Sequence, residues 1–165
     1  MKKIRIAVLC FVLLFGFMSQ AFAPLPAHRI ALGVQLGAKF GDVKNVFGVP
    51  ERVTMEEIKS EAYGDFVEST FIYDKESIIV KFYNEDAWKI ESTGKNGWAT
   101  PDGVTVGMSL KDMVARLGKE DIKNPADNGE TLYWYNHDTK SQENRGNLYV
   151  FVKGGRVSRI VIAYQ

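Results

Sequence analysis

The chain has 165 residues, of which 45% are hydrophobic and 25% are charged. This composition supplies the core of one ordinary domain or two very small ones, and it excludes a fully disordered chain. Lysine and arginine number 21 and aspartate and glutamate 20, so the sequence offers no basic field for nucleic acid or for an anionic membrane surface.

The N-terminal segment predicts a secretory signal peptide. A short basic region at residues 2–5 is followed by an apolar run at 6–18, and small residues then lie two apart at Ala21 and Ala23. The apolar run is shorter than the roughly 20 residues that a membrane-spanning helix needs. We expect a signal peptide at residues 1–23 with cleavage after Ala23. Cleavage after Ala21 and an uncleaved membrane anchor are the alternatives.

Cleavage would remove three basic residues and the single cysteine, Cys10. The remaining chain would carry 18 basic and 20 acidic side chains, a net charge of about −2. Without cysteine it has no disulfides, thiolate metal sites or cysteine nucleophiles, so packing alone must stabilise it. We therefore expect a periplasmic or secreted bacterial protein with no stable membrane insertion after cleavage.

The first half of the remaining chain predicts a short helix followed by strands. A turn at Gly37 precedes apolar residues at helical spacing between 40 and 47, and Gly48 follows as the helix cap. The periodicity then changes to 2, which predicts strands at 70–73, 77–83 and 87–92. Residues 52–59 allow a further edge strand, although their charges weaken that assignment.

The second half begins after a predicted linker at 94–102. Ser109 with Asp112 three residues later forms a capping-box pattern, apolar residues recur at helical spacing from 110 to 117, and Gly118 follows as the left-handed cap. Strands are predicted at 131–135, 147–152 and 156–163, with a hairpin turn at Gly154-Gly155 and a long polar loop at 137–146.

A shift of 70 residues brings the two halves into alignment. It places Gly33, Val34, Gly37, Asp42 and Gly48 on Gly103, Val104, Gly107, Asp112 and Gly118. We therefore predict a tandem repeat with units at 24–93 and 103–165. Each unit is too small to bury a core alone, so the two should share one sheet or one interface. The predicted fold class is α+β, a tandem repeat of two helix-plus-antiparallel-sheet units with the helices on one face.

Alternation divides the strand residues into two sets. The set assigned to the core is Ile72, Ile78, Val80, Phe82, Trp88, Ile90, Trp134, Leu148, Val150, Val152, Ile160 and Ile162. The opposite set is Phe71, Tyr73, Lys81, Tyr83, Tyr133, Tyr135, Tyr149 and Phe151, with Ile79 and Arg159. Its aromatic rings suit a surface that is exposed to solvent in the free protein and covered when a partner binds. We predict the first eight of these residues as a protein-binding face. The alternative is that the protein itself covers them.

The repeated glycine turns, the aspartate in each helix and the closing glycines resemble the β-lactamase inhibitor protein fold. The same pattern is similar to the single-unit outer-membrane assembly lipoproteins called SmpA or OmlA. The matching residues are Gly33-Val34, Gly37, Asp42 and Gly48 in the first unit, and Gly103-Val104, Gly107, Asp112 and Gly118 in the second. The resemblance implies a repeat whose tandem form presents a concave sheet to a protein partner. The chain that remains after cleavage lacks the cysteines of both families, so what carries over is the architecture and protein binding.

Catalytic chemistry has little support in the sequence. The chain has two histidines, His28 near the processed end and His137 in the polar loop. His137 could act with Asp138 and Ser141, or bind metal with Asp138 and Glu143, but local loop neighbours lack the rigid geometry of an active site. We predict no enzyme, no cofactor and no metal, but a protein-binding or structural module of the bacterial cell envelope. The alternatives are a small envelope hydrolase or metal-dependent enzyme using His137, and a small-ligand or peptide-binding module.

Overall fold

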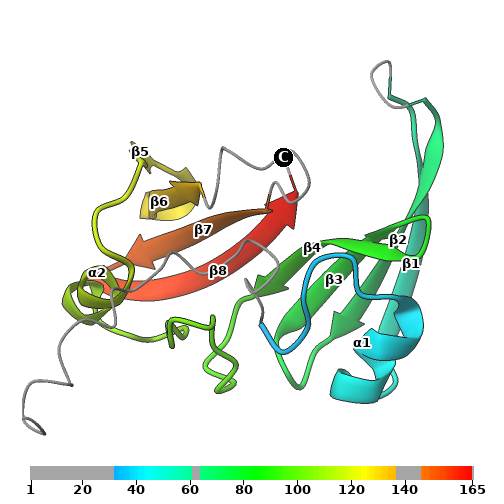
Figure 1. Cartoon of the computed structure of the whole chain (residues 1–165), viewed down its shortest axis with the longest axis horizontal. Coiled ribbons are helices and arrows are strands. Elements are labelled where there is room, and N and C mark those ends of the chain that lie inside the picture. Colours follow the sequence, from blue (N-terminus) through cyan, green and yellow to red (C-terminus); the bar gives the residue numbers. More distant parts are fainter. Residues whose placement is uncertain (1–31, 61–63, 137–145, 165) are drawn as a thin grey trace, which may run out of the picture.

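The computed structural model describes residues 32–60, 64–136 and 146–164. The helices and strands of this part of the chain are α1 (Phe40–Phe47), β1 (Arg52–Ile58), β2 (Phe66–Tyr73), β3 (Ile78–Tyr83), β4 (Asp86–Ser92), α2 (Leu110–Leu117), β5 (Ile122–Pro125), the 3₁₀ turn η2 (Asp127–Gly129), β6 (Thr131–Asn136), β7 (Gly146–Lys153) and β8 (Arg156–Tyr164). The strands form one antiparallel sheet in the order β1-β2-β3-β4-β8-β7-β6-β5 (Figure 1).

This continuous sheet corrects the predicted fold class. The prediction of two helix-plus-antiparallel-sheet units is wrong, because the eight strands form one continuous sheet. The two halves share this sheet, as expected, through β4 and β8, which pair from Lys89 opposite Ala163 to Ser92 opposite Ile160. We call this pairing the seam. It removes two free strand edges, which is favourable because unpaired edges expose main-chain hydrogen-bonding groups. The molecule is mostly a single eight-stranded sheet with two short helices. The predicted boundaries at 24–93, 94–102 and 103–165 stay a prediction.

The two helices span the predicted residues. At the start of α2, the backbone N–H of Asp112 donates a hydrogen bond to Ser109 Oγ at 3.1 Å, which confirms the predicted cap. At the start of α1, the backbone N–H of Lys39 donates to the Asp42 carboxylate at 3.2 Å. Gly118 ends α2 with φ 78° and ψ −155°. The positive φ favours glycine as expected, but the ψ is extended, so the predicted left-handed helical conformation is wrong.

Both helices cover the same face of the sheet, and the core lies beneath them. Cross-strand neighbours on this face are, from β2 to β6, Phe71, Val80, Ile90, Ile162, Leu148 and Tyr135. None of these side chains is more than 4% exposed. From α1, the Phe40 ring packs 4.9 Å from the ring of Phe71, and from α2, Met113 is fully buried. The hydrophobic face of the sheet is therefore the one that carries the helices.

Most predicted strands are confirmed. Residues 70–73 form the end of β2, and the strands predicted at 77–83, 87–92, 131–135, 147–152 and 156–163 correspond to β3, β4, β6, β7 and β8. β1 confirms the edge strand considered at 52–59. The sequence does not predict β5, whose residues Ile122–Pro125 include lysine, asparagine and proline, all of them rare in strands.

Tyr73 allows a pH test of this core. Its side chain is 1% exposed, its hydroxyl has no hydrogen-bond partner among the described residues, and burial raises its pKa to about 12. In the unfolded chain a tyrosine titrates near about 10. The folded state therefore holds this proton more tightly. The contribution of this proton to the free energy of unfolding is fully present below a pH of about 10. It falls by about 1.4 kcal/mol per pH unit until the pH reaches about 12.

We expect Tyr73→Phe to abolish the part of the stability loss at alkaline pH that comes from ionisation of Tyr73. The free energy of unfolding, measured by urea titration at about pH 8 and about pH 11, should fall less between the two conditions in the variant than in the wild type. Tyr135, whose pKa is also raised to about 12, titrates equally in both proteins and cancels in the comparison. Equal losses in the two proteins would contradict the prediction.

Candidate functional site

The face of the sheet opposite the helices is the candidate functional site, and we call it the open face. Cross-strand neighbours on it are, from β1 to β5, Arg52, Ile72, Ile79, Glu91, Val161, Tyr149, Trp134 and Ile122. Apart from Arg52 at the edge and Glu91 near the centre, this row is apolar. A sheet face turned only to water is usually polar, so the composition of the open face calls for an explanation.

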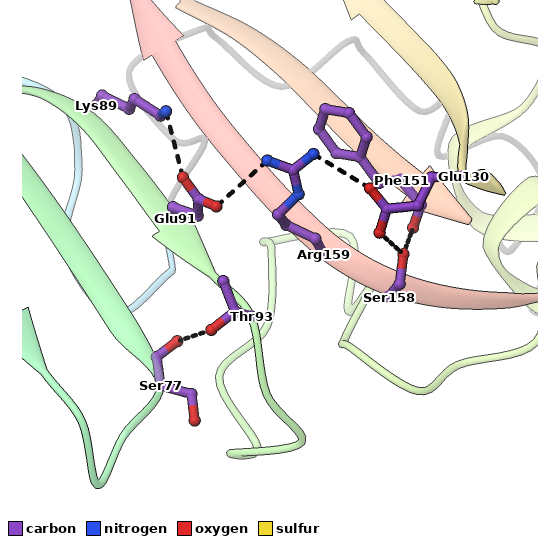
Figure 2. Close-up of polar contacts among 8 residues, drawn as sticks. All are labelled: Ser77, Lys89, Glu91, Thr93, Glu130, Phe151, Ser158 and Arg159. Carbon is purple, nitrogen blue, oxygen red and sulfur yellow. Dashed lines mark hydrogen bonds and ion pairs between the residues drawn. The ribbon is translucent and has the colours of Figure 1, made fainter. Parts of the chain in front are cut away.

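Four charged side chains cross the middle of the open face, namely Lys89, Glu91, Arg159 and Glu130, and we call them the ion-pair row. Lys89 Nζ lies 3.2 Å from the Glu91 carboxylate, and the Arg159 guanidinium lies 3.4 Å from Glu91 and 3.2 Å from Glu130 (Figure 2). The other oxygen of Glu130 accepts a hydrogen bond from Ser158 Oγ at 2.7 Å. The two carboxylate side chains are 13% and 14% exposed, so salt screens them less than it screens surface pairs.

The ion-pair row crosses the seam. Lys89 and Glu91 belong to β4, Arg159 belongs to β8, and Glu130 immediately precedes β6. The seam is thus joined by side chains as well as by main-chain pairing. Figure 2 shows the Arg159 guanidinium between the two carboxylates, one from each side.

Three aromatic residues flank this row on β6 and β7. The Arg159 guanidinium lies 3.6 Å from the centre of the Phe151 ring, a cation–π contact. The rings of Trp134 and Tyr149 stack with their centres 5.6 Å apart. Trp134 Nε1 donates a hydrogen bond to Asn147 Oδ1 at 3.0 Å. Burial raises the pKa of Tyr149, and its hydrogen bond with Asn147 opposes that rise. The three rings are half-buried and held in place.

The other end of the open face carries a second charge pair. Lys81 on β3 is ion-paired with Glu68 on β2, whose side chain is 7% exposed. Beside it, the rings of Phe66 and Tyr83 meet edge to face at 4.7 Å. Lys81 lies opposite Lys89 in the β3–β4 register, so the Lys81–Glu68 pair adjoins the ion-pair row. Charged and aromatic groups are therefore combined on both sides of the centre.

The eight residues predicted as one binding face lie on two faces. Phe71, Tyr73, Tyr133 and Tyr135 are in the helix-covered core, with exposed fractions between 1% and 4%. Lys81, Tyr83, Tyr149 and Phe151 are on the open face. The prediction that all eight share one surface is therefore wrong, and the alternative of internal cover holds for the first four. A binding role for the other four stays a prediction.

The register of β2 and β6 explains this difference. β2 has three consecutive large apolar residues, at 71–73, and β6 has four, at 132–135, so alternation alone does not say which of them point inward. Pairing places Phe71 opposite Val80 and Tyr133 opposite Val150, both core residues. Consequently Ile72 and Trp134, predicted as core, lie on the open face.

Sequence reasoning also missed most of the ion-pair row. Arg159 is in the strand set opposite the predicted core, although it is not one of the eight predicted binding residues, and Lys89, Glu91 and Glu130 are in neither set. Lys89 and Glu91 alternate with apolar residues in the strand predicted at 87–92, and that spacing is a usable signal for the exposed face. Nothing local connects Glu130 with Arg159, because the two are 29 residues apart.

A hollow of about 620 Å³ lies beside the start of α2. Lys95, Thr105, Ser109 and Arg156 are among its lining residues. Two of its polar groups are already bonded, since Ser109 caps α2 and Arg156 donates a hydrogen bond to the Gly107 carbonyl at 3.1 Å. The hollow is therefore less suited to a ligand than its volume suggests.

The residues of the catalytic alternative are not among those described. His28, His137, Asp138, Ser141 and Glu143 lie outside the described residues, as do the predicted signal peptide at 1–23 and its cleavage site at Ala23. Within the described ranges, no group of histidine, cysteine, aspartate and glutamate side chains could hold a metal ion. No helix in the same ranges is long and apolar enough to cross a membrane.

Comparison with known proteins identifies the fold but no family. No protein-family model and no curated protein sequence match the chain. A cysteine-rich secretory protein from Staphylococcus aureus has a similar structure over 85% of this chain and 48% of that one, with 12% identity and a TM-score of 0.55. The chain thus spans about half the length of that structure. At this identity the match shows a shared fold alone.

Two further structures are more distant. An extracellular protein with an SCP domain from Bacillus anthracis matches over 79% of this chain and 44% of that one, with 12% identity and a TM-score of 0.47. A candidate β-lactamase inhibitor protein from Streptococcus mutans matches over 76% of this chain and 82% of that one, with 15% identity and a TM-score of 0.32. The Streptococcus mutans structure is the kind of protein that the sequence resembles, but this match is too weak to carry an argument. No comparison supports the resemblance to the outer-membrane assembly lipoproteins.

Proposed function

We propose that the protein is an exported, non-catalytic binding module whose open face contacts a protein partner. The single observation that carries this proposal is the composition of that face. It combines half-buried Trp134, Tyr149 and Phe151 with Arg159, and no described helix covers it. Tryptophan, tyrosine and arginine are the residues that contribute most often to the centres of protein interfaces. Export rests on the N-terminal pattern at residues 1–23.

The contacts of these side chains favour binding over a merely solvated surface. The Arg159–Phe151 contact and the Trp134–Tyr149 stack hold the groups in one geometry before a partner arrives. Groups that are already ordered lose less conformational entropy on association. The ion-pair row carries two positive and two negative groups, so the matching surface should be apolar and close to neutral overall.

A site-specific photo-cross-linker tests this proposal. In cells of the producing organism, the cross-linking amino acid at Tyr149 should give a discrete heavier product with one protein. At Val114, which is 37% exposed on the helix side, the same amino acid should give none. Phe151→Ala should then weaken binding of the purified partner by more than about fivefold, and Val114→Ala should not. Absence of a product at Tyr149, or equal loss in both alanine variants, would contradict the proposal.

A further inference from the structure

The strand β1 forms one edge of the sheet and is unusually exposed. No described segment pairs with its outer side, and six of its seven residues are exposed. Its end reaches past β3, because Glu57 and Ile58 pair with β2 residues that lie beyond the β2–β3 pairing (Figure 1). An unpaired strand of this length is a template for another strand.

The opposite edge of the sheet is protected. There β5 is four residues long and ends at Pro125, which has no backbone N–H to donate. A partner that adds a strand is therefore expected at β1 and not at β5. Pairing through one edge alone gives a closed dimer and not an extended fibre.

Exposed apolar side chains gather around β1. Seven large hydrophobic residues are exposed in the described ranges, and five of them lie between positions 46 and 67, from the last turn of α1 to the second residue of β2. The five are Val46, Val49, Val53, Met55 and Val67. Met55 is 70% exposed, and its neighbour on the same face of the strand, Val53, is 48% exposed. Apolar groups left in water next to a free edge favour a partner that covers both.

The charges of β1 are complementary to those of a second, antiparallel copy of β1. A twofold axis perpendicular to the sheet keeps the helix sides together, so residues of like face oppose each other across the axis. With Thr54 opposite Thr54, Arg52 faces Glu56 of the second copy and Val53 faces Met55 of the second copy. By symmetry each of these pairs occurs twice. Glu56 now lies beside Glu68 on β2, so an arginine on its other side would offset a like-charge contact.

The registers with Met55 or Glu56 on the axis are less favourable. With Met55 on the axis, Arg52 faces Ile58 and Val53 faces Glu57, so charges oppose apolar side chains. With Glu56 on the axis, two glutamates face each other. The Thr54 register has one kind of like-charged pair, which also occurs twice: Glu51, just before β1, faces Glu57 of the second copy. The Glu51 carboxylate already accepts a hydrogen bond from the backbone N–H of Asp74 at 3.1 Å, which holds it toward β2.

We propose that two copies of this protein pair through β1 in this antiparallel register, with Thr54 on the twofold axis. The dimer is one sheet that continues across the axis. Both open faces then lie on the same side and stay uncovered, so the inference stands or falls independently of the proposed partner. Within one copy, the Arg52 guanidinium lies 2.7 Å from the Asp74 carboxylate. In the dimer, Arg52 would also reach Glu56 of the second copy.

Cysteine cross-linking tests the register. In a Cys10→Ser background, Thr54→Cys should give a disulfide-linked dimer under mild oxidation, because the two side chains oppose each other across the axis. The matched control is Thr70→Cys, the direct neighbour of Thr54 on β2 and on the same face, which should stay monomeric on reducing-agent-free gels. A dimer formed equally by Thr70→Cys, or formed by Met55→Cys in place of Thr54→Cys, would overturn the proposal.

Charge reversal tests the association itself. Analytical ultracentrifugation of the wild type should give a monomer–dimer equilibrium, and Glu56→Arg should raise its dissociation constant by about tenfold or more, because two attractive pairs become repulsive. Glu57→Arg makes the same change in net charge one residue along, on the other face of the strand, and should not weaken the dimer. A monomer at every concentration, or equal effects of the two variants, would overturn the proposal. Circular dichroism confirms that both variants are folded.

Discussion

Replacing Tyr135 by alanine should lower the free energy of unfolding by about 3–5 kcal/mol, the range typical of a buried aromatic side chain. The Tyr135 side chain is 4% exposed between β6 and the end of α2. Its truncation leaves a cavity between the sheet and the end of α2. Urea unfolding followed by circular dichroism measures the loss directly.

Tyr149→Ala is the matched control, since both residues are tyrosines on adjacent strands. Tyr149 is half-buried on the open face and stacks on Trp134, so its loss should cost only about 1 kcal/mol. The two substitutions thus distinguish the covered face from the open one without knowledge of any partner. Similar costs for both would mean that the assignment of the two faces is wrong.

Arg159→Met should cost about 2–3 kcal/mol, because it leaves two partly buried carboxylates without their shared cation. Methionine keeps much of the apolar stem but removes the contacts with Glu91 and Glu130 and the cation–π contact with Phe151. Glu91 would retain Lys89, and Glu130 would retain Ser158, so neither carboxylate becomes wholly isolated. The expected loss is therefore below that of an ion pair in a dry core.

The comparison variant is Lys39→Met, at an exposed ion pair. Lys39 Nζ lies 2.7 Å from Asp86, a shorter distance than in the Arg159 pairs, but the two side chains are 57% and 45% exposed. Exposed pairs contribute less than about 1 kcal/mol, since water and salt screen them. Thermal and urea unfolding should therefore show a larger loss of stability for Arg159→Met than for Lys39→Met, although the Lys39 pair has the shorter distance. If Arg159→Met costs no more than Lys39→Met, the ion-pair row contributes nothing beyond a surface pair.

Local features of the fold were predictable from the sequence. Ser109 with Asp112, the apolar spacing from 110 to 117 and the closing Gly118 define α2 because capping and helical periodicity act within a few residues. The Gly154-Gly155 turn likewise joins β7 and β8, since both residues adopt positive φ. These signals depend on neighbouring residues and need no knowledge of the remaining chain.

The assembly of the elements was not predictable in the same way. The seam pairs Ile90 with Ile162, and nothing near either residue indicates the other. The same is true of the faces of β2 and β6, where consecutive apolar residues allow both orientations until pairing with β3 and β7 decides. The same limit applies to the candidate site, because the Glu91–Arg159 pair forms only after β4 and β8 are adjacent. What remained hidden is thus the set of contacts between residues that are far apart in the chain.

The seam also has a consequence for the order of folding. The strands β2, β3 and β4 follow one another through short turns, and so do β7 and β8, so these hairpins close small loops at little entropic cost. Glu91 and Arg159 are 68 residues apart, and non-local pairing of this kind slows folding. Closure of the seam should therefore come late, after the hairpins on each side have formed. A partly folded chain would already hold the Arg159–Glu130 pair in its second half but would lack the Glu91–Arg159 pair, so the ion-pair row is complete only in the fully folded protein.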